Sequence, residues 1–166
     1  MEYWRGAMKV KFGWIVAGAL GLLIGGGYLY DVAQAKDYEF ELVKTTAKTI
    51  VADGESTVRI SVKLSKDDKP VEGHTIYIYA SNGTLPSSRY VTDADGMITI
   101  RYYPYAYLND ELTPLQDVTL YFQDESNSKF FMVNAKAEFS FPVVKPEANG
   151  VQRDWQDVRV EEADEN

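Results

Sequence analysis

Few side chains in this sequence could carry catalytic chemistry. The chain contains no cysteine and one histidine, His74, which excludes thiol nucleophiles, thiolate zinc sites, iron–sulfur clusters and sites built from several histidines. His74 follows Gly73 at the start of an expected strand, and because no carboxylate partner is evident we expect it to be structural or exposed. We therefore predict no catalytic residue, no metal ligand and no cofactor, and we expect that the protein is not an enzyme.

Two acidic residues have the spacing of a partial calcium loop. The sequence Asp93-Ala94-Asp95-Gly96 places alternate carboxylates where one hard cation could be shared. The remainder of such a loop, including its terminal bidentate glutamate, is missing from the sequence. A turn before a strand is therefore the better interpretation, and calcium binding by a loop is left open.

A tyrosine-rich segment is the best candidate for a binding function. It reads Tyr102-Tyr103-Pro104-Tyr105-Ala106-Tyr107, and the proline ends the preceding strand. We expect Tyr105 and Tyr107 to project from a loop. We predict that Tyr103, Tyr105 and Tyr107 contact a partner, because tyrosine covers a large area with little loss of rotamer entropy and keeps a polar tip. The alternative is a loop folded back on the domain, with its rings covering an open end of the core.

The acidic tail, residues 145–166, carries another aromatic candidate. Residues 151–166 hold six acidic residues and two arginines. Val151, Trp155 and Val158 follow a helical spacing, so this stretch could form a short amphipathic docking helix. Because Trp155 is unexpected in a purely solvated tail, we predict that it docks on a neighbouring subunit or on its own domain.

Charge and glycine are distributed unevenly along the chain. The formal net charge is −8, which argues against nucleic acid as a partner, because general nucleic-acid binding needs a basic surface that displaces phosphate counterions. The charged residues before residue 31 are Glu2, Arg5, Lys9 and Lys11, which leaves 24 acidic and 14 basic residues from residue 31 onward. Seven of the 12 glycines also lie in the first 30 residues. The first 30 residues therefore differ from the rest of the chain in having few charges and most of the glycines.

Residues 12–30 are predicted to be a transmembrane helix. The run FGWIVAGALGLLIGGGYLY has 19 residues and no charge, and a helix of that length reaches about 28 Å, close to the roughly 30 Å hydrocarbon core of a bilayer. Basic residues in segment 1–11 precede the run and Asp31 follows it, so the positive-inside rule places 1–11 in the cytoplasm. We expect residues 31–37 to be a linker and the rest of the chain to be periplasmic or extracellular. The predicted location is the cell membrane, crossed once, with the lipid bilayer as a direct partner.

A cleaved signal peptide is the alternative. Val32-Ala33-Gln34-Ala35 has small residues at the positions that signal peptidase requires for cleavage after Ala35. The stretch between the apolar run and that site is long and contains aromatic residues and Asp31, which favours a retained anchor. Both interpretations export the domain.

The small residues of the apolar run are spaced for helix packing. Ala17, Gly21 and Gly25 recur every four residues, so they lie on one face and would let another membrane helix approach closely. Because glycine is common in membrane helices, a chance match is the alternative. We predict that Ala17, Gly21 and Gly25 pack against helices of other membrane-protein subunits.

From Tyr38 onward the apolar residues alternate with polar ones, which is the period of β-strands. The clearest run is Val58-Arg59-Ile60-Ser61-Val62-Lys63-Leu64. Turn sequences such as Asp53-Gly54 and Asn82-Gly83 separate the runs. About seven short strands within residues 38–144 predict an all-β domain, an antiparallel β-sandwich.

Five sequence blocks, in their order and spacing, resemble the bacterial Ig-like group 1 domain of invasin and intimin. They are ADGES at 52–56, VRISV at 58–62, KPVEG at 69–73, ASNGTL at 80–85 and TDADG at 92–96. The resemblance covers about residues 38–144. It implies an Ig-like sandwich outside a cell or virion, used as a stalk, spacer or adhesive module without catalysis.

The setting of this domain differs from that of invasin-type proteins, which carry tandem arrays presented by an outer-membrane barrel. This chain has one copy behind one apolar helix. We therefore expect a non-enzymatic, single-pass accessory or structural subunit of a larger membrane or envelope complex. The alternatives are a cell-surface adhesin or receptor-binding module, and a secreted or virion Ig-like decoration protein.

Overall fold

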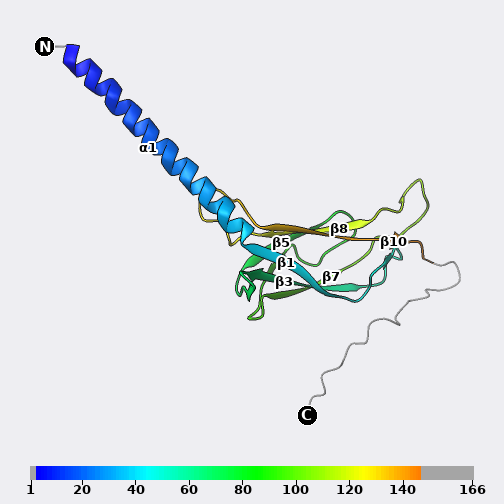
Figure 1. The fold of residues 1–166 in the computed structure, drawn as a ribbon. Coiled ribbons are helices and arrows are strands. Elements are labelled where there is room, and N and C mark those ends of the chain that lie inside the picture. Colours follow the sequence, from blue (N-terminus) through cyan, green and yellow to red (C-terminus); the bar gives the residue numbers. More distant parts are fainter. Residues whose placement is uncertain (1–2, 147–166) are drawn as a thin grey trace.

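A 34-residue helix, α1 (Tyr3–Lys36), leads directly into a domain of β-strands. The computed structural model describes residues 3–146, with side chains from residue 13 onward. Figure 1 shows α1 projecting from one end of the strand domain. The strands are β1 (Tyr38–Thr45), β2 (Ile50–Val51), β3 (Val58–Lys66), β4 (Lys69–Pro70), β5 (Thr75–Ala80), β6 (Arg89–Val91), β7 (Met97–Tyr102), β8 (Val118–Asp124), β9 (Lys136–Phe141) and β10 (Val143–Val144).

The strands form two antiparallel sheets that face each other. In one sheet β3 pairs with β1, β4 and β7, and in the other the order is β6-β5-β8-β9. The short strands β2 and β10 add a parallel pair. Among the described residues, seven strands have three or more residues, so the predicted all-β, Ig-like antiparallel sandwich is confirmed.

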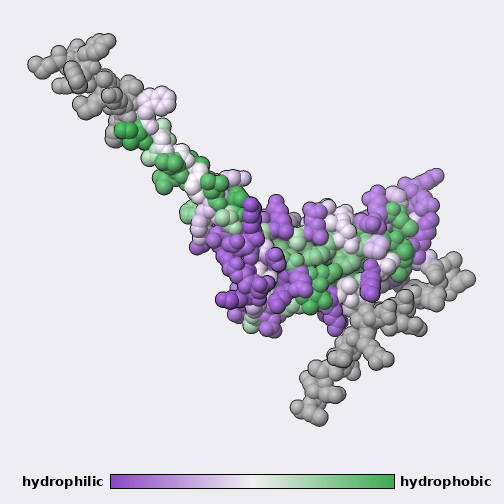
Figure 2. Space-filling model, viewed as in Figure 1, coloured by the Kyte–Doolittle hydropathy of each residue, from purple (hydrophilic) through white to green (hydrophobic). Residues whose placement is uncertain are grey.

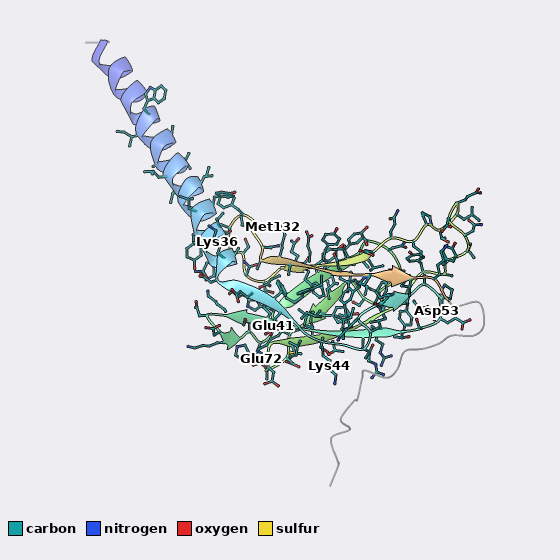
Figure 3. The ribbon with its side chains drawn as sticks, turned by 45° about the vertical axis from the view of Figure 1, so that its right-hand side comes forward. Lys36, Glu41, Lys44, Asp53, Glu72 and Met132 are labelled. Carbon is teal, nitrogen blue, oxygen red and sulfur yellow. The ribbon has the colours of Figure 1, made fainter. Side chains whose placement is uncertain are left out.

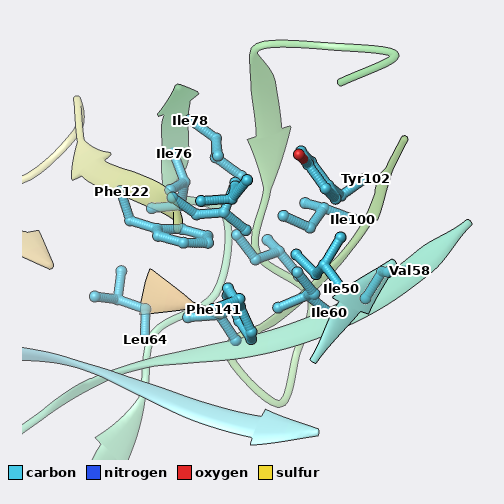
Figure 4. Packing of buried hydrophobic residues seen from close by; sticks show 14 residues of the cluster. Ile50, Val58, Ile60, Leu64, Ile76, Ile78, Ile100, Tyr102, Phe122 and Phe141 are labelled. Carbon is cyan, nitrogen blue, oxygen red and sulfur yellow. The ribbon is translucent and has the colours of Figure 1, made fainter. Parts of the chain in front are cut away.

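Alternation of buried and exposed residues builds the core between the sheets. In β3, Val58, Ile60, Val62 and Leu64 are buried while the residues between them face outward. This strand thereby places one face in the core, as a half-buried strand must. Figure 4 shows how side chains of both sheets meet. The core residues are Ile50, Val58, Ile60, Val62, Leu64, Ile76, Ile78, Ile98, Ile100, Tyr102, Val118, Leu120, Phe122 and Phe141.

One predicted turn depends on glycine for two reasons. Gly83 has a φ of +75°, a left-handed conformation that costs other residues free energy. A Cβ at Gly83 would also overlap the hydroxyl of Tyr102, which lies at the end of β7. The turn can therefore cover the Tyr102 ring only because residue 83 has no side chain.

The expected linker at residues 31–37 is instead mostly helix. Helix α1 continues to Lys36, and Asp37 alone separates it from β1. Val32-Ala33-Gln34-Ala35-Lys36 contains neither proline nor glycine, and Lys36 lies in the last turn, where a positive charge complements the helix dipole. Contacts with the sandwich, described below, also hold this final part of the helix.

The helix is long and apolar enough to cross a bilayer. Residues Gly13–Lys36 reach a mean hydropathy of 1.6 over their most apolar stretch, and little of that stretch is buried inside the protein. Figure 2 shows hydrophobic side chains along the helix and a mixture of hydrophilic and hydrophobic residues on the visible face of the sandwich.

Candidate functional site

The junction between helix and sandwich centres on Asp31, a buried acidic residue of α1. Its carboxylate accepts hydrogen bonds from the loop that joins β8 to β9. The donors are the hydroxyl of Ser128 at 2.9 Å and the backbone N–H groups of Lys129 at 3.1 Å, Phe130 at 2.8 Å and Phe131 at 2.6 Å. Hydrogen bonds to a carboxylate are stronger than those between neutral groups. Asp31 therefore ties the loop to the helix across about one hundred residues of sequence.

Aromatic contacts extend this junction along the helix. The ring of Phe131 lies 6.3 Å from that of Tyr28, and the ring of Phe130 lies 5.9 Å from that of Tyr30, both edge to face. A Cβ at Gly27 would come within 2.9 Å of the Phe131 ring. Gly27 therefore lets the aromatic loop approach the helix backbone.

A further contact joins the end of the helix to the first sheet. The ammonium group of Lys66, at the end of β3, donates a 2.6 Å hydrogen bond to the side-chain oxygen of Gln34. The same ammonium group lies 4.9 Å from the ring centre of Tyr38 in β1, within the range of a cation–π interaction. The helix is thus held by both sheets of the sandwich.

The lone histidine has a carboxylate partner that sequence reasoning missed. The Nδ1 atom of His74 lies 2.7 Å from Asp124, which is fully buried at the end of β8, and the Tyr38 ring packs against the imidazole at 5.5 Å. Asp124 also accepts a hydrogen bond from the backbone N–H of Ser126. These contacts give His74 a structural role, because they join the start of β5 to the end of β8.

The tyrosine-rich loop folds back on the domain, as the alternative interpretation has it. Tyr105 is half-buried against the core, and its hydroxyl accepts a hydrogen bond from the backbone of Gln116. The backbone N–H of Tyr107 donates to the carbonyl oxygen of Ala52 at 2.8 Å. Tyr105 and Tyr107 therefore do not project freely, because the segment 52–53 pairs with the backbone of the tyrosine-rich loop. Tyr103 is the most accessible of the three predicted contact residues, with 37% of its surface exposed.

Tyr107 belongs to a small charged cluster. Its hydroxyl donates to Asp110 at 3.0 Å, and the ammonium group of Lys145 lies 3.1 Å from Asp110 and 4.8 Å from the centre of the Tyr107 ring. The hydrogen bond from Lys145, followed by that from Tyr107, lowers the pKa of Asp110. Because Asp110 is largely exposed, we expect this cluster to contribute little to stability.

The small residues predicted for helix packing have no packing partner among the described residues. The face of Ala17, Gly21 and Gly25 is exposed, and a Cβ at Gly21 or Gly25 would meet no atom of the described residues within 4 Å. Trp155 and the docking helix predicted around it lie outside the described residues. The packing and docking roles of these residues therefore stay predictions.

The carboxylates in the two acidic turns accept hydrogen bonds from backbone N–H groups. A carboxylate oxygen of Asp93 accepts from the backbone N–H groups of Asp95 and Met97, which is the turn geometry predicted for this segment. Asp53 forms a similar turn with Glu55 and Ser56. Partial burial acts to raise the pKa of Asp53, but the backbone hydrogen bonds outweigh it and keep that pKa below its usual value.

Comparisons with known proteins concern the fold. No family model and no curated protein matches the sequence. The D0-D1 domain of intimin matches with 22% identity and a TM-score of 0.44, over 65% of this chain and 49% of that one. A 282-residue fragment of intimin in complex with the intimin-binding domain of the translocated intimin receptor matches with 21% identity and a TM-score of 0.46, over 62% of this chain and 33% of that one. The chain is similar to Ig-like domains of intimin.

A conjugative transposon lipoprotein from Bacteroides eggerthii also matches. Its identity is 16% and its TM-score 0.40, over 63% of this chain and 96% of the lipoprotein. The chain spans about half or less of the two intimin structures. These findings agree with the resemblance of residues 38–144 to the invasin and intimin group, and they concern the fold alone.

Sequence reasoning missed the residues that join helix to sandwich. Asp31 falls in the predicted linker, and the sequence marks it only as the acidic residue that ends the apolar run. Phe130-Phe131-Met132 was also overlooked, although this apolar triplet breaks the strand alternation. Neither signal identifies the partner segment, because the two are about one hundred residues apart.

Proposed function

We propose that this protein is a non-enzymatic, single-pass membrane-anchored subunit of a larger membrane or envelope complex. Its N-terminus is cytoplasmic, and its Ig-like domain contacts other proteins in the periplasm or outside the cell. The observation that carries the proposal is an apolar helix whose C-terminal end is built into the sandwich. A helix meant only for secretion has no need of such contacts.

The junction supports a retained helix over a cleaved one. Cleavage after Ala35 would remove Asp31 and leave the hydroxyl of Ser128 and three backbone N–H groups without their acceptor. Unpaired polar groups of this kind are costly where water is excluded. It would also remove Gln34, the partner of Lys66.

Two surfaces are suited to partner subunits. The exposed face of Ala17, Gly21 and Gly25 can receive another membrane helix. The second surface lies at the opposite end of the sandwich, since Tyr38 pairs with Lys66 near the helix while the loop after Tyr102 starts beside Val58, at the other end of β3. This distal surface consists of exposed Tyr103, Leu108 and Leu112, together with the half-buried Tyr105 and Tyr107.

Recovery of partners after mild detergent extraction tests the helix surface. Gly21→Leu is expected to reduce the amount of co-purified partner, because a larger side chain prevents close approach of a second helix. Gly26→Leu is the matched control, since residue 26 lies well away from residue 21 around the helix and also has open space at its Cβ. Equal losses for both variants, or none, would contradict the helix-packing role.

Native sizing separates this proposal from the cell-surface adhesin. Migration of the extracted chain as an isolated 18.7 kDa protein in its detergent belt would favour the adhesin. Mass spectrometry of the mature N-terminus tests the secreted alternative, because a chain that starts at Lys36 would overturn the membrane-anchored subunit.

A further inference from the structure

We infer that the tip of the β8–β9 loop, residues Lys129–Met132, lies in the outer interface of the bilayer and sets the orientation of the sandwich on the membrane. This inference rests on the proposed membrane anchor and adds a second point of lipid contact to it. The tip is part of the exported domain, far in sequence from the apolar helix.

The tip exposes an unusual amount of apolar surface. Phe130 is 64% exposed, Phe131 42% and Met132 87%. These are three consecutive large apolar residues at the tip of one loop. Such a patch indicates a contact surface, because isolated apolar residues are common on proteins but contiguous ones are not.

The position of the tip points to lipid. Phe131 and Phe130 pack against Tyr28 and Tyr30, the last aromatic residues of the apolar run. Figure 3 shows Met132 beside the C-terminal end of α1, near Lys36. The tip thus continues the apolar surface of the helix at the depth where tyrosines meet lipid headgroups.

The composition of the tip fits an interface between water and hydrocarbon. Lys129 is exposed next to the aromatic residues, so its ammonium group can reach lipid phosphates while the phenyl rings and the methionine enter the acyl boundary. A partner protein would also cover apolar side chains, but it would not explain why they continue the surface of the membrane helix.

The contacts of Asp31 fix the tip against the helix. The carboxylate of Asp31 accepts hydrogen bonds from the backbone N–H groups of Lys129, Phe130 and Phe131. The position of the helix in the bilayer therefore determines the position of the tip. Lys66 and Gln34 restrain the other side of the junction. The sandwich is then held in one orientation, with its distal surface directed away from the membrane.

Site-directed spin labelling of the full chain tests this inference, because a protein without cysteine accepts a single label at any chosen site. Met132→Cys is labelled in vesicles of phosphatidylcholine and phosphatidylglycerol, and its accessibility to oxygen is compared with that to a water-soluble nickel chelate. Leu108→Cys on the distal surface is the aqueous control and Leu22→Cys on the helix the lipid control, since all three side chains are at least two-thirds exposed.

The expected result is an oxygen-to-nickel accessibility ratio at residue 132 that is several-fold higher than at residue 108. If residue 22 contacts lipid while residue 132 behaves like residue 108, the inference is overturned and the membrane anchor stands. If residues 22 and 132 are both aqueous, the proposed anchor fails as well. A label at residue 132 that neither reagent reaches would indicate a protein partner and overturn lipid contact.

Discussion

Two turn glycines with the same backbone conformation differ in what surrounds them. Gly73 and Gly83 have φ angles of +77° and +75°. A Cβ at Gly73 would meet no atom within 4 Å among the described residues, whereas one at Gly83 would overlap Tyr102. The pair therefore separates the cost of backbone conformation from the cost of overlap.

Gly73→Ala is expected to lower the free energy of unfolding by about 1 kcal/mol, the cost of a left-handed alanine. Gly83→Ala is expected to lower it by about 2 kcal/mol more, because the added methyl group displaces the Tyr102 ring from a packed core. Urea denaturation of the full chain in detergent micelles measures both. Equal losses would show that the turn at Gly83 moves freely away from Tyr102.

The Tyr102 side chain beside Gly83 leads to a second prediction. Its hydroxyl is buried without a hydrogen-bond partner among the described residues. Burial raises the pKa of Tyr102 to about 12, and nearby Tyr105 adds to the effect. Tyr102→Phe is expected to leave the free energy of unfolding at pH 7 unchanged or to raise it by about 1 kcal/mol, because it removes an unpaired buried group.

The pH dependence of stability should distinguish Tyr102 from Tyr102→Phe. The pKa of Tyr102 in the folded chain is raised above the unfolded value of about 10. The stability that comes from keeping Tyr102 protonated is therefore fully present below pH 10. It is lost as the pH rises from about 10 toward 12, since the unfolded chain releases the proton first. The native chain is therefore expected to lose stability more steeply than Tyr102→Phe in that range. Parallel profiles in denaturation experiments would contradict the raised pKa.

The element that most determines how this protein is built is the β8–β9 loop with the last turns of α1. An acceptor on the helix meets donors on the loop, and a glycine on the helix meets a phenyl ring. Without the loop, the carboxylate of Asp31 on the helix would lack its hydrogen-bond donors. Without the helix, the backbone N–H groups of the loop would lack their acceptor. We expect them to order together.

Asp31→Ala is expected to raise the hydrogen-exchange rates of the amides of residues 129–131 by about tenfold or more, because each loses a charge-assisted hydrogen bond. Asp37→Ala is the matched control, since Asp37 is exposed and lies in the same connection. Exchange measured by mass spectrometry on the full chain in micelles would show the difference. Unchanged protection of the loop in Asp31→Ala would mean that other contacts hold the junction.

At the scale of the whole molecule, charge and apolar surface agree on one arrangement. Arg5, Lys9 and Lys11 precede the apolar run of the helix, so the positive-inside rule favours the proposed orientation across the membrane. The junction then places the distal surface at the end of the sandwich remote from the helix. The two proposed contact surfaces for proteins are therefore separated by the length of the domain.

This arrangement predicts the side of the membrane that the domain occupies. A cysteine at Leu108, which is 67% exposed, is expected to react with a membrane-impermeant thiol reagent added outside intact cells that express the chain. Lys9→Glu combined with Lys11→Glu is expected to reduce this labelling, because it removes the positive charge that retains the N-terminus in the cytoplasm. Labelling only after lysis in the unmodified background would reverse the proposed orientation.

Much of the architecture is present in local sequence. Alternation in Val58–Leu64 predicts a strand with one buried face, and Asp-Gly and Asn-Gly pairs predict turns, because both depend on neighbours only a few residues apart. The uncharged run at residues 12–30 predicts a helix able to span a bilayer for the same reason. These features determined the all-β sandwich behind one apolar helix.

The tertiary structure decided what depends on distant residues. The carboxylate of Asp31 is buried because a loop about one hundred residues later supplies its donors. Tyr105 packs against the core, and the segment at 52–53 pairs with the backbone of Ala106 and Tyr107. His74 likewise finds Asp124 only across the sheet. The sequence shows which polar and aromatic side chains the chain has. Hydrogen bonds and packing between remote segments determine which of those side chains remain accessible to a partner.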